Sequence, residues 1–243
     1  MRKFLVIMVL ILGGVLFLGQ GQAQATAFTF GDNTIYWPGF GNGLDDDTDV
    51  IGSPEILGGG GEIDDNGYLT SIYFDYQSGS NLKAGDVFID LGADGTWEYL
   101  IASGNLYSDN STTTNNGFWR GVYKISSINT LVYKYSDEYY GTGGWSYREN
   151  HPVGLAYSNS AYSVDDDGID FTDFGSGDGQ VIFSGLDGLH VGDNSFIVGF
   201  APTCANDVIY EKVPEPSVLL LLGFGLLGLG VCSGRNLFVG KKG

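Results

Sequence analysis

Two short acidic runs hold the residues of this chain whose type and spacing could bind a metal ion. Ca²⁺ takes about six to eight oxygen ligands, and closely spaced carboxylates on a glycine-bearing loop can supply several of them. Neither run has the ligand spacing of an EF-hand. The alternative to a calcium site is that both runs are solvated loops that keep a secreted protein soluble. Ca²⁺ is the one cofactor that the sequence suggests. The candidate ligands are Asp45, Asp47, Asp49, Asp165, Asp167 and Asp170.

A tyrosine-rich segment offers a second kind of chemistry, the binding of sugars. Aromatic rings stack on the apolar faces of sugar rings, while carboxylates and amides bind the hydroxyl groups. Several glycines in the segment favour an open loop, and Trp37 and Trp119 are further candidate members of such a site. The alternative is that these aromatic side chains pack the core. The candidate glycan-binding residues are Tyr139, Tyr140, Trp145 and Tyr147.

The chain offers little that could perform enzyme catalysis. His151 and His190 are its only histidines, and they do not have the spacing of metal ligands. Neither a Gly-x-Ser-x-Gly nucleophile elbow nor a phosphate-binding loop occurs between the two termini. Cys204 is the only cysteine before the C-terminal apolar stretch, and we expect it to be a small buried thiol on the last strand, with a reactive or cross-linking thiol as the alternative. The sequence therefore predicts a protein without enzyme activity and without catalytic residues.

The C-terminal end consists of three parts in a fixed order. A prolyl motif is followed by an uncharged apolar stretch over residues 218–234 and by a basic tail over residues 235–243. As a helix, the apolar stretch would span roughly 25 Å, close to the thickness of a bilayer core, and basic residues after it are typical of a cytoplasmic end. An ordinary single-pass anchor with a fortuitous proline motif is the alternative. The motif residues are Val213, Pro214, Glu215, Pro216 and Ser217.

This three-part end resembles the PEP-CTERM sorting signal of bacterial surface proteins. Two further segments also resemble sequence segments found in such proteins. They are residues 83–90 together with 94–99, and the Cys-Ala-Asn-Asp-Val-Ile segment at 204–209. The resemblance implies that a membrane-embedded exosortase reads the Pro-Glu-Pro element and removes the tail. It further implies an exported protein found beside exopolysaccharide production, with a polysaccharide as a candidate partner and no established activity.

The N-terminal residues 1–25 have the pattern of a secretory signal peptide. Arg2 and Lys3 precede an apolar core, and a small-residue cleavage site with Ala23 and Ala25 follows it. We expect cleavage after Ala25, so that one ectodomain over residues 26–212 precedes the sorting signal at 213–243. The expected route is export through the inner membrane of a Gram-negative-type bacterium to the cell surface or the extracellular matrix.

The charge of the chain lies almost entirely between its two ends. All 29 acidic residues fall within residues 32–215, where only six of the 11 Lys and Arg residues lie, so this span has a net charge of −23. Such a surface repels nucleic acid, which excludes DNA and RNA as partners. The chain also has 15 Tyr, 15 Phe and four Trp residues, which supply ample apolar area for a folded core.

Alternation of apolar and polar residues with a period of two predicts an all-β ectodomain. The clearest strand covers residues 68–76, and segments 87–91 and 96–101 form a hairpin over an Asp-Gly step, with Trp97, Tyr99 and Ile101 on one face. Further strands are expected at residues 118–125, 130–135, 180–184 and 195–200.

Many short strands without a fixed repeat favour a jelly-roll-like β-sandwich, with a barrel as the alternative. The function that we expect is that of an exported, non-enzymatic surface or matrix protein associated with exopolysaccharide. The alternative is a carbohydrate-binding module with calcium-stabilised loops.

Overall fold

The computed structural model describes residues 25–40, 50–106, 117–126, 133–136, 148, 150–157, 161–164, 168–192 and 194–214. In these residues the chain forms thirteen β-strands and almost no helix. The strands are β1 (Thr26–Phe30), β2 (Glu55–Ile63), β3 (Leu69–Ser80), β4 (Val87–Leu91), β5 (Tyr99–Ala102), β6 (Gly121–Ile125), β7 (Tyr133–Tyr135), β8 (Pro152–Leu155), β9 (Ala161–Ser163), β10 (Asp170–Thr172), β11 (Ser176–Ser184), β12 (Phe196–Phe200) and β13 (Ile209–Val213).

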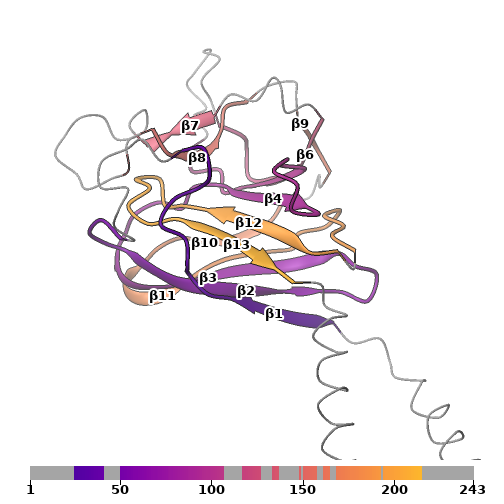
Figure 1. Cartoon of the computed structure of the whole chain (residues 1–243), viewed down its shortest axis with the longest axis horizontal. Coiled ribbons are helices and arrows are strands. Elements are labelled where there is room, and N and C mark those ends of the chain that lie inside the picture. Colours follow the sequence, from indigo (N-terminus) through magenta and orange to yellow (C-terminus); the bar gives the residue numbers. More distant parts are fainter. Residues whose placement is uncertain are drawn as a thin grey trace, which may run out of the picture.

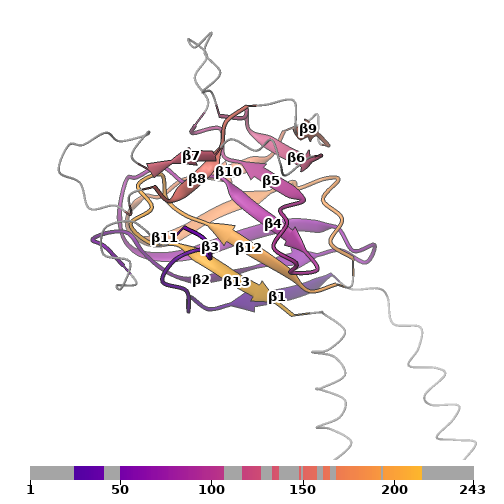
Figure 2. The ribbon, with the colours of Figure 1, turned by 45° about the horizontal axis from the view of Figure 1, so that its top comes forward.

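Two large antiparallel sheets enclose the main hydrophobic core. A five-stranded sheet has the order β1-β2-β3-β11-β10, and a six-stranded sheet has the order β13-β12-β4-β5-β6-β9. Figure 2 shows β13, β12, β4, β5 and β6 side by side, and Figure 1 shows β1, β2 and β3 beneath them. Side chains from both sheets meet in the core: the rings of Phe74 in β3 and Phe200 in β12 stack at 3.9 Å.

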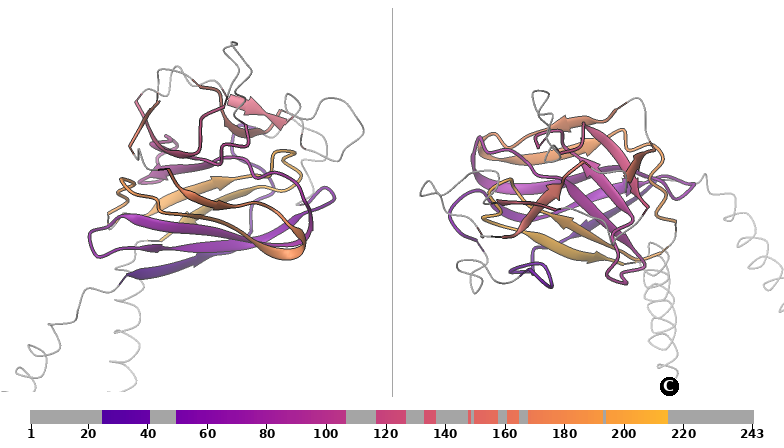
Figure 3. Two further views of the ribbon diagram at one scale, coloured as in Figure 1. Left: turned by 180° about the vertical axis from the view of Figure 1, so that it is seen from behind. Right: turned by 90° about the horizontal axis from the view of Figure 1, so that it is seen from above.

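The six-stranded sheet is covered on both faces. Alternate residues of its strands enter two different cores, so that Ile89 packs between the large sheets while Phe88 and Leu100 face a second apolar cluster. The hairpin of β7 and β8 lies over this second face (Figure 3). Because both faces are buried, β4, β5 and β12 are apolar along most of their length rather than strictly alternating.

Strand β2 contains four consecutive glycines at 58–61, because aromatic rings lie directly against its backbone. A Cβ atom added at Gly59 would lie 2.9 Å from Cζ of Phe30, and one at Gly61 would lie 2.8 Å from Cζ of Phe28. Carbon atoms do not approach this closely without a shift, so side chains are excluded here. The glycines allow β1 and its rings to cover β2.

The predicted all-β fold is confirmed. Strand β3 covers most of the predicted strand 68–76 and buries Ile72, Phe74 and Tyr76. Strands β4 and β5 pair as the predicted hairpin. The remaining predicted strands each overlap an observed one, namely β6, β7, β11 and β12. Strands β1, β2, β8, β9, β10 and β13 were not predicted.

The expected position of Trp97 is wrong. Tyr99 and Ile101 lie in the core between the large sheets, whereas Trp97 packs in the second cluster on the opposite face. Strand β5 begins only at Tyr99, and the turn before it is folded onto Asp90, whose carboxylate accepts the N–H groups of Asp94 and Gly95. The alternation within β5 therefore does not extend back to Trp97.

Candidate sorting site and binding surfaces

The two ends of the β-domain meet at one end of the molecule. Val213, the last residue of β13, pairs with Phe196, whose ring lies 5.5 Å from that of Phe28 in β1. Just after β1, the N–H of Asn33 donates to Oε1 of Glu211 in β13 at 2.7 Å. Strand β1 therefore starts where β13 ends, and Figure 1 shows both at the lower right of the molecule.

The prolyl motif begins at the end of a folded strand. Val213 is completely buried, while Pro214 directly after it is exposed. At the other terminus Ala25 is exposed and β1 starts at Thr26. The other residues predicted for the two processing sites lie outside the described residues; these are Ala23, Glu215, Pro216 and Ser217.

The Cys-Ala-Asn-Asp-Val-Ile segment holds together chain segments that are far apart in sequence. The carboxylate of Asp207 accepts the N–H of Ile56 at 2.5 Å, and Nδ2 of Asn206 donates to the carbonyl of Pro54 at 2.8 Å. The thiol of Cys204 donates to Oδ1 of Asn206 at 3.0 Å, and burial raises its pKa to about 11. The prediction of a buried, unreactive thiol agrees with this geometry, although Cys204 precedes β13 rather than lying on it.

Two large buried side chains bind the backbone of the same segment. The indole Nε1 of Trp37 donates to the carbonyl of Ile209 at 2.7 Å, and Nη1 of Arg148 donates to the carbonyl of Asn206 at 3.2 Å. Both side chains are almost fully buried. Trp37 is therefore part of the core, which removes it from the candidate glycan-binding residues.

His151 lies in the aromatic cluster around Trp37 and is fully buried, with its ring 5.2 Å from that of Trp37. Neither of its ring nitrogens forms a hydrogen bond of acceptable geometry within the described residues. Burial lowers the pKa of His151 to about 3; the positive charge of Arg148 lowers it too, and the backbone of Phe40 partly offsets these effects. His151 is therefore a neutral core side chain and not a metal ligand in this arrangement.

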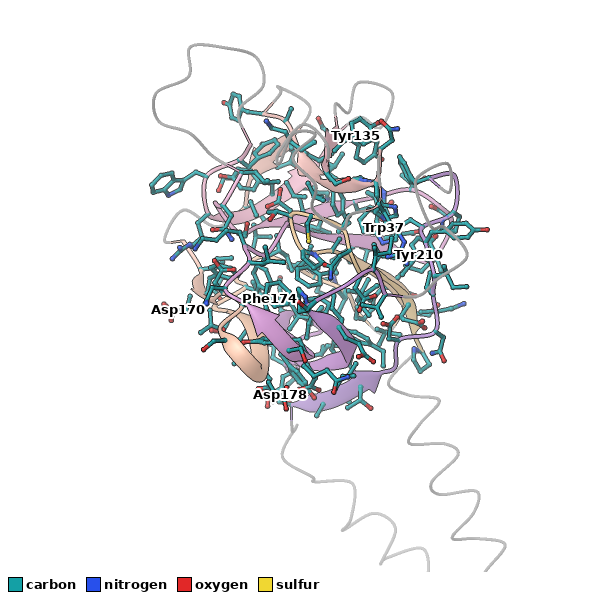
Figure 4. All side chains as sticks on the ribbon, turned by 90° about the vertical axis from the view of Figure 1, so that its left-hand side faces the viewer. Trp37, Tyr135, Asp170, Phe174, Asp178 and Tyr210 are labelled. Carbon is teal, nitrogen blue, oxygen red and sulfur yellow. The ribbon has the colours of Figure 1, made fainter. Side chains whose placement is uncertain are left out.

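Tyr135, in the described part of the tyrosine-rich segment, lines a hollow on the surface. It has a volume of about 360 Å³ and is lined by Gly39, Phe40, Tyr135 and Asn150. Figure 4 shows Tyr135 on the same side of the molecule as Trp37. The glycan-binding candidates Tyr139, Tyr140, Trp145 and Tyr147 all lie outside the described residues.

Two buried carboxylates have structural partners. Asp86 is fully buried, and its Oδ1 accepts the N–H of Ser103 at 3.0 Å while its Oδ2 accepts that of Leu155 at 3.4 Å. Burial raises the pKa of Asp86 to about 7, although these hydrogen bonds oppose the shift. Asp90 is also buried, and its carboxylate accepts two N–H groups of the hairpin turn.

A second hollow lies between the segments that lead into β6 of one large sheet and β10 of the other. It has a volume of about 280 Å³, and its lining includes Trp119, Arg120 and Ile169. The side chain of Trp119 is exposed, at 64% of its surface. Within the described residues, Trp119 is the one candidate glycan-binding residue that is exposed at a hollow. The adjacent Arg120 was not predicted, because nothing in the sequence distinguishes it from other surface cations.

Most of the candidate calcium ligands lie outside the described residues. Only Asp170 of the six candidates lies within the described residues, where it is exposed at the end of β10 opposite Ser184 (Figure 4). The described part of the chain contains no group of three or more His, Cys, Asp or Glu residues that could hold a metal ion. The calcium site stays a prediction.

No described residue belongs to a helix that is long and apolar enough to cross a bilayer. The predicted signal peptide lies outside the described residues except for Ala25, and the apolar stretch at 218–234 lies wholly outside them. Both segments therefore stay predictions from the sequence.

Comparison with known proteins identifies the C-terminal end. No curated protein and no solved structure matches the chain. Residues 212–235 match the family model of the PEP-CTERM protein-sorting motif, from the last residues of β13 through the apolar stretch. By this motif the chain is an exported bacterial protein that carries a PEP-CTERM sorting signal, the signal for exosortase-dependent sorting toward the cell surface.

Proposed function

We propose that this chain is a non-enzymatic surface or extracellular-matrix protein whose C-terminal tail is removed by exosortase. The observation that carries the proposal is the sorting motif at residues 212–235, which starts where the last strand of the β-domain ends. Cleavage next to β13 would detach a complete β-domain from its membrane segment. The delivered part would then be the two-sheet domain with its acidic surface.

The chemistry of the described residues supports a role without catalysis. His151 is buried among aromatic rings, and the thiol of Cys204 is buried with a pKa raised to about 11. His190 is exposed, but its Nε2 lies 3.1 Å from the carbonyl of Asn66, which it binds. These contacts serve the fold, and within the described residues none of the three groups belongs to a set of three or more His, Cys, Asp or Glu side chains that could hold a metal ion.

The jelly-roll-like classification belongs to the same proposal. Strands distant in sequence pair within each sheet, β3 with β11 and β4 with β12, and the chain passes between the sheets after β3, β9 and β11. Such connections are typical of Greek-key and jelly-roll domains. These domains commonly mediate binding and assembly, which fits a matrix component beside exopolysaccharide.

Sorting is tested in a host that has exosortase. Pro214→Ala and Glu215→Ala should each leave uncleaved precursor in the membrane fraction, detected by immunoblot as a larger band. Pro38→Ala and Glu62→Ala are matched controls on exposed residues of the β-domain, and both should be processed like the wild type. Normal processing of the two motif variants would refute exosortase-dependent cleavage.

A second candidate function, carbohydrate binding with calcium-stabilised loops, is favoured by the exposed indole of Trp119 at a hollow. For the calcium part, an ion at one hundred times its Kd should stabilise the domain by about 2.7 kcal/mol. Thermal unfolding of the protein with millimolar Ca²⁺ and with chelator measures this. Equal melting temperatures in the two conditions would remove calcium from the proposal.

A further inference from the structure

The hollow beside Trp119 lies between the segments that lead into β6 of one large sheet and β10 of the other. Arg120, just before β6, reaches toward the edge strand β10 of the other sheet, and its guanidinium lies 5.4 Å from the centre of the Phe171 ring. Ile169, which is almost fully buried in the main core, contributes an apolar wall. The lining of the hollow is completed by Gly104 and Gly168.

The backbone that presents Trp119 is anchored on both sides. Phe118 is buried, with its ring 4.6 Å from that of Tyr123 and 5.3 Å from that of Tyr157. The hydroxyl of Tyr123 donates to the carbonyl of Trp119 at 3.0 Å. Because Phe118 points into the core, the next side chain points outward, so the exposed indole stands on a fixed support.

Arg120 is also held in place, by its Nε atom and by its flat face. Nε donates to the carbonyl of Ser103 at 3.3 Å, while the guanidinium face lies over Phe171. Gly104 allows this approach, because an added Cβ there would lie 3.2 Å from Cβ of Arg120. Within the described part of the chain the two Nη groups donate to no protein atom, so they are available to a ligand in the hollow.

We infer that this hollow binds one sugar ring of a neutral polysaccharide. A flat exposed indole beside fixed N–H donors matches the two faces of a pyranose, which are apolar C–H groups and hydroxyl oxygens. The volume of about 280 Å³ lies at the small end of ligand pockets, which suits one ring of a longer chain. The proposal rests on the second candidate function above and gives it a site and a ligand class.

The charge of the domain favours a neutral polymer over a polyanion. The span 32–215 has only six cations against 29 acidic residues. Asp170 is exposed beside Ile169, so a uronate chain that reached Arg120 would also meet negative charge. A single arginine can donate hydrogen bonds to hydroxyl groups without offsetting that repulsion along a polymer.

The test is affinity electrophoresis of the protein as its host produces it, released or solubilised in detergent, in native gels. The gels contain a β-glucan, a galactomannan or polygalacturonate. At least one neutral polymer should retard the wild type, and Trp119→Ala should weaken that retardation at least about fivefold, the loss expected when a stacking aromatic face is removed. Trp119→Phe should retain part of the affinity, and Arg120→Gln should lose several-fold.

Tyr36→Ala is the matched control, because Tyr36 is another exposed aromatic residue and lies in the segment that packs against β13, at the far edge of the six-stranded sheet. It should bind like the wild type. The inference is overturned if no neutral polymer retards the folded wild type, if only polygalacturonate does, or if Trp119→Ala binds normally. The assay does not depend on cleavage of the tail. A negative binding result would therefore not affect the sorting proposal, which the processing of the Pro214 and Glu215 variants tests separately.

Discussion

Two buried titratable residues give the β-domain opposite responses to pH. The pKa of Asp86 is raised to about 7, so the folded state holds a proton that the unfolded chain releases above about pH 4. The free energy of unfolding therefore falls as pH rises from about 4 to 7. The pKa of His151 is lowered to about 3, so between pH 3 and 6.5 its imidazole is protonated only in the unfolded chain. The free energy of unfolding therefore rises with pH over this interval.

We expect the two effects to oppose each other in the wild type, and single variants to separate them. Between pH 4.5 and 6, Asp86→Asn should gain stability relative to the wild type by about 1.4 kcal/mol per pH unit as pH rises. His151→Phe should lose stability relative to the wild type by a similar amount over the same interval. Urea unfolding at several pH values measures both, and differences from the wild type that do not change with pH would contradict the buried states described here.

Asp207 is the residue of the 204–209 segment whose replacement should cost most. Both carboxylate oxygens are occupied, by the N–H of Ile56 at 2.5 Å and that of Val208 at 2.8 Å. Asp207→Asn replaces one acceptor with an NH₂ group that faces an N–H donor, so the free energy of unfolding should fall by about 1–3 kcal/mol. Asp187→Asn, at an exposed residue, is the control and should stay within about 0.5 kcal/mol of the wild type. Equal denaturation midpoints for the two variants would show that the Asp207 contacts do not stabilise the domain.

At the level of elements, strands with a regular alternation could be predicted from the sequence. Strand β3 buries every second residue between Ile72 and Tyr76, and the β4–β5 hairpin contains Gly95 with a φ of 88°, the conformation that the Asp-Gly step indicates. The short strands β8, β9 and β10 carry too few residues for a pattern to be visible. Their pairing depends on contacts between segments far apart in sequence.

Strand β2 could not be predicted, because its central residues have no side chains to alternate. Its role can be tested by adding one carbon atom. A Cβ at Gly61 would lie 2.3 Å from the carbonyl oxygen of Ser71 in the neighbouring strand, so Gly61→Ala should destabilise the domain by about 1–3 kcal/mol. Gly31→Ala is the control, since the nearest atom to its Cβ is the flexible end of Asn33. Similar melting temperatures for both variants would show that β2 tolerates side chains.

The candidate sites show a similar limit of sequence reasoning. The sorting motif could be predicted because its order of proline motif, apolar stretch and basic tail is local. The hollow beside Trp119 combines β10 of one sheet with the segment before β6 of the other. The sequence does not distinguish Trp37 from Trp119 as a candidate binding residue. The fold does, because it buries Trp37 and exposes Trp119.

For the whole molecule, the main consequence of the fold is that its two ends lie together. Strand β1 begins where β13 ends, at one end of the two-sheet domain. We therefore expect the predicted signal peptide and the predicted apolar tail to leave the domain on the same side, so that the precursor faces the membrane with that end. Removal of both segments would leave a domain that starts at β1 and finishes just after β13.

The most direct test of this account is the mass of the mature protein recovered from the surface or medium of an exosortase-containing host. We predict an intact mass, with terminal peptides to match, for a chain that starts at Thr26 and ends upstream of Val218. A host without exosortase should yield only the longer form. A surface form that still contains peptides from residues 220–243 in the exosortase-containing host would contradict the central claim that the tail is a temporary membrane tether.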